Sequence, residues 1–150
     1  MATDTRPPET KGPEKFTFAR HETFHLRQGW LFKGLNALSA DPLALYAPDA
    51  HHQLGVGINM LRSILYWVQA TDLVRPAVDG PRFRCPLELT RVGGLVKTHD
   101  PYFEDLVTQW IIHLQLASNM SLATFWYWVF NEFPGREFTE DRLVDGMGRY

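Results

Sequence analysis

The residues best suited to nucleic-acid chemistry lie in a predicted helix at about 58–70. Apolar side chains recur in it at helical spacing: Met60, Leu61, Ile64, Leu65 and Val68. This spacing predicts a stripe that packs inward. The opposite face carries Asn59, Arg62, Ser63 and Tyr66. Because amide, guanidinium and hydroxyl groups read base edges and bind phosphate oxygens, we expect this face to contact double-stranded DNA.

A β-hairpin is predicted directly after this helix. Asp79-Gly80 is a turn signal between two short extended runs at 73–78 and 82–85. Pro81 complicates the register, because proline cannot donate a hydrogen bond to a neighbouring strand. Arg82 and Arg84 on such a hairpin would reach the phosphates of a bound duplex.

The order of these segments indicates the fold class. A helix, a turn at Gly55-Val56-Gly57, a second helix, the hairpin and a helix led by Leu89-Thr90 follow the order of a winged helix-turn-helix. We expect a mainly α protein that forms one compact unit. It would comprise a flexible tail at 1–14, a winged-helix-like domain with a short hairpin at 15–98, and a C-terminal helical extension at 99–150. The alternative is an all-helical domain whose arginines are simply solvated.

Other polar residues give weaker indications of chemistry. His21, Glu22 and Arg27 precede an apolar helix without an evident capping task. This leaves either a functional polar contact or a buried hydrogen-bond network. The six histidines form no metal-ligand pattern, Cys85 has no redox partner, and residues 55–57 lack the ending of a nucleotide-binding loop. We therefore predict no catalytic residue, no metal and no cofactor, and a protein that is not an enzyme.

Charge is distributed unevenly, although the formal net charge is only −2. Residues 57–98 hold six Lys and Arg against three acids, whereas residues 99–150 hold three Arg against eight acids, a balance of −5. The first region would attract phosphates and the second would repel them. The chain has one cysteine, a polar N-terminus and no apolar run of roughly 20 residues. These features favour a cytoplasmic protein without a membrane span.

The last third of the chain is predicted to bind protein. Two helices are expected between Pro101 and Pro134, and they are rich in aromatic residues. Trp128 falls off the stripe formed by residues 122, 125, 126, 129 and 130. An aromatic side chain outside the core stripe is either a second buried face or an interface anchor. We expect Trp128 to contact a second copy of the chain or a subunit of a modification enzyme.

Several sequence blocks together resemble a known family. They are residues 21–24, 27–31, 54–57, 59–60, 66–67, 89–90, 100–102, 104–105, 110, 126–127 and 131–133. In these blocks the chain is similar to the uncharacterised bacterial domain-of-unknown-function family numbered 4007, over roughly residues 16–145. It departs from the family pattern at Ile58, where members have Lys, and this removes a phosphate contact. Members of the family are also longer than this chain.

The resemblance implies a biological context. Members of this family accompany DNA phosphorothioation-type modification enzymes and sulfate-activating reductase homologues, which implies a role in DNA modification or phage defence. We expect a non-enzymatic DNA-binding or DNA-sensing accessory protein. The alternative is an adaptor subunit that docks a modification enzyme without touching DNA. Salt dependence separates the two, because phosphate contacts release counterions.

Overall fold

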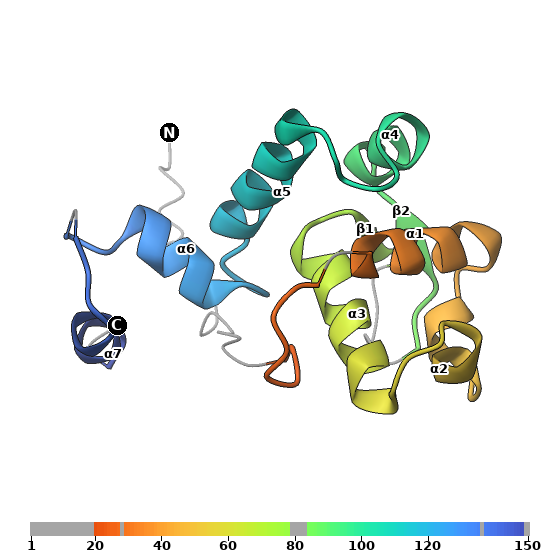
Figure 1. Ribbon diagram of the computed structural model, residues 1–150, viewed down its shortest axis with the longest axis horizontal. Helices are drawn as coiled ribbons and strands as arrows, with labels where there is room; N and C mark the ends of the chain where they lie inside the picture. The colour runs from red at the N-terminus through yellow and green to blue at the C-terminus, as the bar shows by residue number, and fades with distance from the viewer. Residues whose placement is uncertain (1–19, 28, 79–83, 136, 149–150) are drawn as a thin grey trace, which may run out of the picture.

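The computed structural model describes residues 20–27, 29–78, 84–135 and 137–148. The predicted tail at 1–14, the hairpin tip at 79–83 and Arg82 lie outside the described residues. The elements follow one another as shown in Figure 1: α1 Trp30–Ala40, η1 Ala44–Tyr46, α2 Ala50–Gln53, α3 Ile58–Ala70, β1 Val74–Pro76, β2 Leu87–Leu89, α4 Arg91–His99, α5 Leu106–Ser118, α6 Thr124–Asn131 and α7 Glu140–Met147. The described part is therefore mainly helical, as predicted, with a two-stranded sheet.

Helix α3 forms the centre of the core. Ile64, Trp67 and Val68 are almost fully buried, and α1 packs across the helix (Figure 1). The close approach depends on Gly34 of α1, because a Cβ there would lie 2.6 Å from Cγ1 of Val68. Burial of such large apolar side chains is the main favourable contribution to folding. The inward-facing stripe predicted for this helix is confirmed at Leu61, Ile64 and Val68, whereas Met60 and Leu65 are half-buried.

The hairpin is confirmed, but its second strand begins later than the sequence predicts. Strands β1 and β2 pair antiparallel, with Arg75 opposite Glu88. Nε of Arg75 donates to Oε1 of Glu88 at 2.9 Å. Arg84 has a φ of 55°, and this left-handed backbone interrupts the run predicted at 82–85. The second strand therefore starts at Leu87.

Helix α4 packs against the start of the hairpin at very short range. The Thr90 hydroxyl accepts a hydrogen bond from the Gly93 N–H at 3.0 Å and donates one to the Asp72 carbonyl at 2.7 Å. Gly93 lies so close to the Leu73 carbonyl that a Cβ would collide with it. The helix led by Leu89-Thr90 is confirmed, and Thr90 both caps it and docks it.

The C-terminal helices extend away from the part formed by α1–α4 (Figure 1). Helices α5 and α6 pack against each other, and α7 lies beyond α6. The first of the two helices expected between Pro101 and Pro134 begins later than Pro101: α5 starts at Leu106, and Asp105 caps it by accepting a backbone hydrogen bond at 2.7 Å. Asp100 instead accepts two backbone hydrogen bonds in the preceding turn. Phe103, whose backbone is left-handed with a φ of 59°, lies between Asp100 and the start of α5.

Candidate nucleic-acid interface

The outer face of α3 presents two of the residues predicted to contact DNA. Asn59 and Arg62 are exposed, and Nη1 of Arg62 donates to Oδ1 of Asn59 at 3.3 Å. Ile58, the first residue of the helix, is exposed beside them. A guanidinium, an amide and an apolar side chain therefore share the solvent-facing start of α3. These groups complement the acceptors, donors and methyl groups at base-pair edges.

Ser63 and Tyr66 are buried, so the expectation that their side chains are exposed on this face is wrong. Tyr66 is nevertheless one of the residues that line a groove along this face. Ser63 is 0% exposed, and its Oγ has no hydrogen-bond partner among the described residues. Tyr66 is 8% exposed, and its hydroxyl donates to the Leu122 carbonyl at 2.8 Å. Burial raises the pKa of Tyr66 to about 12. Helix α3 is covered on two sides, by α1 and by the segment joining α5 to α6. Its exposed face is therefore narrower than the face expected for a helix that packs on one side only.

A groove of about 580 Å³ runs along this outer face and contains three arginines from separate segments. Arg62 comes from α3, Arg84 from the connection between β1 and β2, and Arg20 from the segment before α1. The floor is apolar and includes Leu61 and Leu65. None of the described residues that line this arginine groove is acidic. Three cations gathered on one hollow form a surface suited to a polyanion.

The hairpin supplies one described arginine to this groove. Of the two predicted to meet phosphates, Arg84 is exposed and lines the groove, whereas Arg82 lies outside the described residues. Arg75 of β1 is exposed and forms an ion pair with Glu88. Sequence reasoning missed Arg20, because nothing in its local pattern indicates that it lies beside α3.

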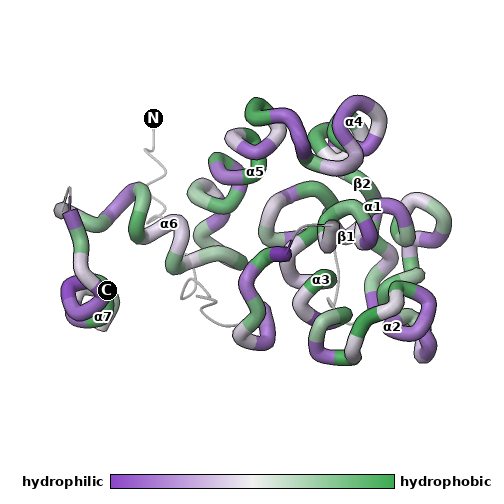
Figure 2. Tube along the Cα trace, in the orientation of Figure 1, coloured by the Kyte–Doolittle hydropathy of each residue, from purple (hydrophilic) through white to green (hydrophobic). Residues whose placement is uncertain are grey.

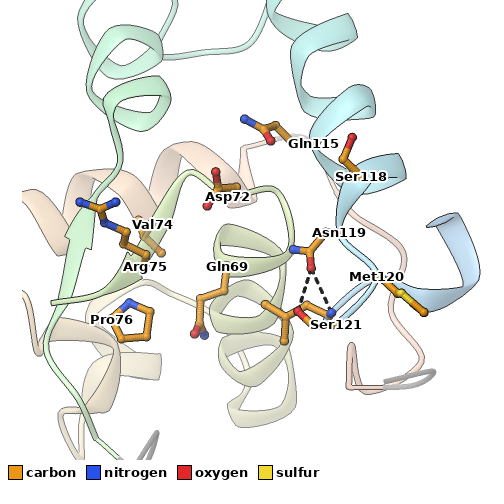
Figure 3. Close-up of a pocket in the computed structure, with 11 residues that line it drawn as sticks. Gln69, Asp72, Val74, Arg75, Pro76, Gln115, Ser118, Asn119, Met120 and Ser121 are labelled. Carbon is orange, nitrogen blue, oxygen red and sulfur yellow. Dashed lines mark hydrogen bonds between the residues drawn. The ribbon is translucent and has the colours of Figure 1, made fainter. Parts of the chain in front are cut away.

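A second pocket, lined mostly by polar residues, lies beside the end of α3 (Figure 3). Its volume is about 490 Å³, and it shares Gln69 and Leu122 with the groove. Asn119 holds its wall: Nδ2 donates to the Ala70 carbonyl at 3.0 Å, and Oδ1 accepts from the Leu122 N–H at 3.1 Å. Partial desolvation raises the pKa of the Asp72 carboxyl in this pocket. The segment that joins α5 to α6 therefore lines both hollows.

Comparison with known protein families shows which family the chain belongs to. The family model described as "Protein of unknown function (DUF4007)" matches residues 18–150. The chain belongs to the DUF4007 family. The resemblance predicted from the sequence blocks is thereby confirmed. None of the curated proteins compared with this DUF4007 chain matches it.

Two solved structures are similar to this DUF4007 chain. The crystal structure of magnesium ion-bound SspB has 36% sequence identity and a TM-score of 0.74, and the match covers 89% of this chain and 41% of the SspB chain. Another SspB crystal structure has 34% identity and a TM-score of 0.76, covering 89% of this chain and 42% of the SspB chain. This chain therefore spans about two fifths of the length of the SspB chains that it matches.

The polar residues before α1 of this DUF4007 chain occupy separate places. The His21 ring stacks on Trp67 with 5.8 Å between centroids, and its Nδ1 has no partner among the described residues. The Arg27 guanidinium lies 5.3 Å from the ring centre of Phe24. Glu22 has a φ of 52°. Ring and cation contacts therefore hold this segment, together with a hydrogen bond that Nε1 of Trp67 donates to the Phe24 carbonyl at 3.3 Å.

Trp128 is buried, so the prediction that it is an exposed anchor for a partner is wrong. Its side chain is 4% exposed, and its ring lies 5.3 Å from that of Phe133. Helix α7 covers it, because a Cβ on Gly146 would lie 2.8 Å from the Trp128 ring. The strongly exposed tryptophan of the described region is Trp110 of α5, at 58%. The sequence carries a signal for it, because α5 has apolar residues on more than one face.

Two other kinds of feature are absent from the part of the DUF4007 chain that the structure describes. No group of three or more His, Cys, Asp or Glu residues in that part could hold a metal ion. No helix formed by those residues has the length and apolar character to cross a membrane.

Proposed function

We propose that this chain is a non-enzymatic, DNA-binding accessory protein of a DNA-modification or phage-defence system. In this proposal α3 is the recognition helix of a winged helix-turn-helix. The order α1, α2, α3 and the β1–β2 hairpin supports it, because this is the order in which that motif places its elements. The exposed face of α3 enters the major groove, and the hairpin lies along neighbouring phosphates.

The convergence of Arg20, Arg62 and Arg84 on one groove is the observation that carries the proposal. Arg62 and Asn59 lie on the outer face of α3, where they meet base edges. Arginine pairs well with guanine, and asparagine pairs well with adenine. Arg20 and Arg84 flank that face and neutralise phosphates. An apolar floor between them excludes water and strengthens these contacts.

The family context supports DNA modification as the setting. Both solved relatives carry the name SspB, which fits a protein of a phosphorothioation system. One of those SspB structures holds a magnesium ion. For this chain we propose no catalytic step. Magnesium-dependent nicking of plasmid DNA that survives further purification, and is abolished in His21→Ala or Glu22→Ala, would overturn that part of the proposal.

Salt dependence of duplex binding tests the proposed function. Binding is measured by fluorescence anisotropy on a labelled duplex of about 20 bp, roughly two helical turns, over a range of NaCl concentrations. Each phosphate contact contributes roughly 0.9 to the slope of log affinity against log salt. The double variant Arg20→Ala/Arg84→Ala is expected to bind all duplexes more weakly, with a slope lowered by up to about two contacts.

Arg142→Ala is the matched control, because Arg142 is exposed on α7 and lies outside the groove. It should leave affinity and slope unchanged. If the double variant behaves like this control, the groove does not bind phosphates and the docking proposal fails. The alternative function, an adaptor that docks a modification-enzyme subunit without touching DNA, would then be preferred.

A further inference from the structure

Helix α5 is apolar on two opposite faces, but only one of them is buried. Thr108, Ile112 and Leu116 point inward. The other face carries Leu106, Val107, Trp110 and Leu114, which are 58–66% exposed. A helix that is apolar all round is normally covered on all sides. Figure 2 shows hydrophobic residues along both α5 and α6.

The exposed face of α5 continues onto α6 through aromatic contacts. The Trp110 and His113 rings have centroids 5.7 Å apart, and the His113 and Phe130 rings have centroids 4.6 Å apart. Phe130 is itself 56% exposed. We name the surface formed by Leu106, Val107, Trp110, Leu114 and Phe130 the α5–α6 face. Large exposed aromatics of this kind are enriched among the residues that dominate binding energy at protein interfaces.

The stretch of sequence that carries the α5–α6 face is acidic. Residues 98–135 contain no Lys or Arg, whereas they contain four acids: Asp100, Glu104, Asp105 and Glu132. Glu104 and Asp105 are exposed immediately before α5, and Glu132 is exposed immediately after α6. Phosphates would be repelled here, so a nucleic acid is disfavoured. A second copy of the chain would bring the same acids together, which is also unfavourable.

We propose that the α5–α6 face binds a basic amphipathic helix of another protein. Val107, Trp110 and Leu114 follow one another at helical spacing and offer a row of contacts to apolar residues that repeat every three or four positions. Lys and Arg at the edges of that helix meet the acids at both ends of the face. This binding surface is separate from the arginine groove, and it gives the chain a protein partner in addition to the proposed DNA contact.

A designed peptide tests the proposal. The probe is a synthetic Leu/Lys peptide of about 18 residues, or five helical turns, with Leu on one face. One control is a scrambled peptide of the same composition, and the other places Glu where the probe has Lys. The probe is expected to bind and to become helical on binding. Both controls should bind at least roughly tenfold more weakly, because they lack either the apolar stripe or the complementary charge.

Variants of the chain locate the contact. Trp110→Ala/Leu114→Ala should weaken probe binding by roughly tenfold or more, because the substitutions remove two central apolar side chains from the face. Ile58→Ala is the matched control, because it removes an exposed apolar side chain from the arginine groove instead. Thermal unfolding shows whether each variant remains folded, and amide chemical shifts show where the probe contacts the unmodified chain.

Four results would overturn the proposal. In the first, the scrambled peptide binds as well as the probe. In the second, Trp110→Ala/Leu114→Ala binds the probe as tightly as the unmodified chain does, and in the third, the amide shifts cluster away from α5 and α6. In the fourth, sedimentation of the unmodified chain shows a dimer that Trp110→Ala/Leu114→Ala converts to a monomer, which would make a second copy the occupant. None of these outcomes depends on the arginine groove, so the proposed DNA binding stands or falls separately.

Discussion

The hydroxyl of Tyr66 on α3 donates a hydrogen bond at 2.8 Å to the carbonyl of Leu122, which lies in the turn between α5 and α6. This bond, together with that from Asn119 to the Ala70 carbonyl, ties the C-terminal helices to the centre of the core. Tyr66, which the sequence analysis predicted to contact DNA, therefore stabilises the fold through its hydroxyl. Leu122 also lines the arginine groove, so the same tie holds one wall of the candidate site.

Replacing Tyr66 with Phe should destabilise the fold without a direct effect on DNA. The variant removes a part-buried hydrogen bond to the Leu122 carbonyl, and such a bond contributes about 0.5–1.5 kcal/mol. Denaturant unfolding measures this destabilisation. Duplex affinity, measured where the variant is fully folded, should stay near that of the unmodified chain, in contrast to Arg62→Ala. Normal stability combined with abolished DNA binding would show that Tyr66 touches DNA after all.

Stability should fall at high pH because of the same side chain. Burial raises the pKa of Tyr66 from 10.0 to about 12 in the fold. The neutral phenol is thus favoured in the folded state, so its contribution is complete below about pH 10 and is lost as the pH rises toward 12. A shift of this size corresponds to at most roughly 2–3 kcal/mol, and solvent that reaches the hydroxyl reduces this contribution. Unfolding free energies of the unmodified chain and Tyr66→Phe, measured from pH 8 to 12, should converge; parallel curves would contradict the assignment.

The inner side of α3 could be predicted from sequence, but the width of its outer face could not. The apolar spacing of Leu61, Ile64 and Val68 marks one packed side, and those residues are buried. A second packed side is set by segments far along the chain, so Ser63 and Tyr66 carry no local sign of burial. The same limit applies to Trp128, because it is covered by α7, a helix that local periodicity cannot place.

The candidate site shows the same division between local and distant information. Arg62 and Asn59 could be assigned to the outer face of α3 because one helix fixes their spacing. Arg20 could not be assigned, because only the packing of the segment before α1 brings it to the groove. The antiparallel pairing of two strands after α3 was predictable, whereas the later start of β2 follows from the left-handed backbone of Arg84.

Two adjacent glycines of α4 should respond oppositely to replacement by Ala. A Cβ on Gly93 would collide with the Leu73 carbonyl, which is backbone and cannot rotate away, whereas a Cβ on Gly94 meets nothing within 4 Å. Gly93→Ala should therefore destabilise by about 1–3 kcal/mol or more. Gly94→Ala should stabilise by up to about 1 kcal/mol, because alanine favours the helix. Thermal unfolding of both variants checks the prediction, and equal effects would contradict the packing of α4 on Leu73.

Trp128→Ala should damage the C-terminal helices rather than a surface contact. The substitution removes a large side chain that fills the space between α6 and α7, and such truncations cost about 3–5 kcal/mol. Hydrogen exchange should show faster opening of α6 and α7, with α3 less affected. Trp110→Ala is the control, because an exposed tryptophan should cost less than about 1 kcal/mol. Similar exchange in the two variants would mean that α7 does not cover Trp128.

Substitutions in the arginine groove should separate sequence preference from general affinity. Asn59 and Arg62 lie on the outer face of α3, so Asn59→Ala or Arg62→Ala should weaken a preferred duplex by roughly 1–3 kcal/mol for each base-reading side chain removed, with a smaller effect on unrelated duplexes. Arg20→Ala and Arg84→Ala should weaken both kinds of duplex equally, because phosphates carry no sequence information. A duplex selected from a random library supplies the preferred site, and competition anisotropy at fixed salt gives both affinities.

Since Arg62 also donates to Asn59, the variant Asn59→Ala/Arg62→Ala should weaken binding by less than the sum of the two single effects. If Arg62→Ala instead lowers every affinity equally and flattens the salt slope, Arg62 binds a phosphate and α3 does not read bases.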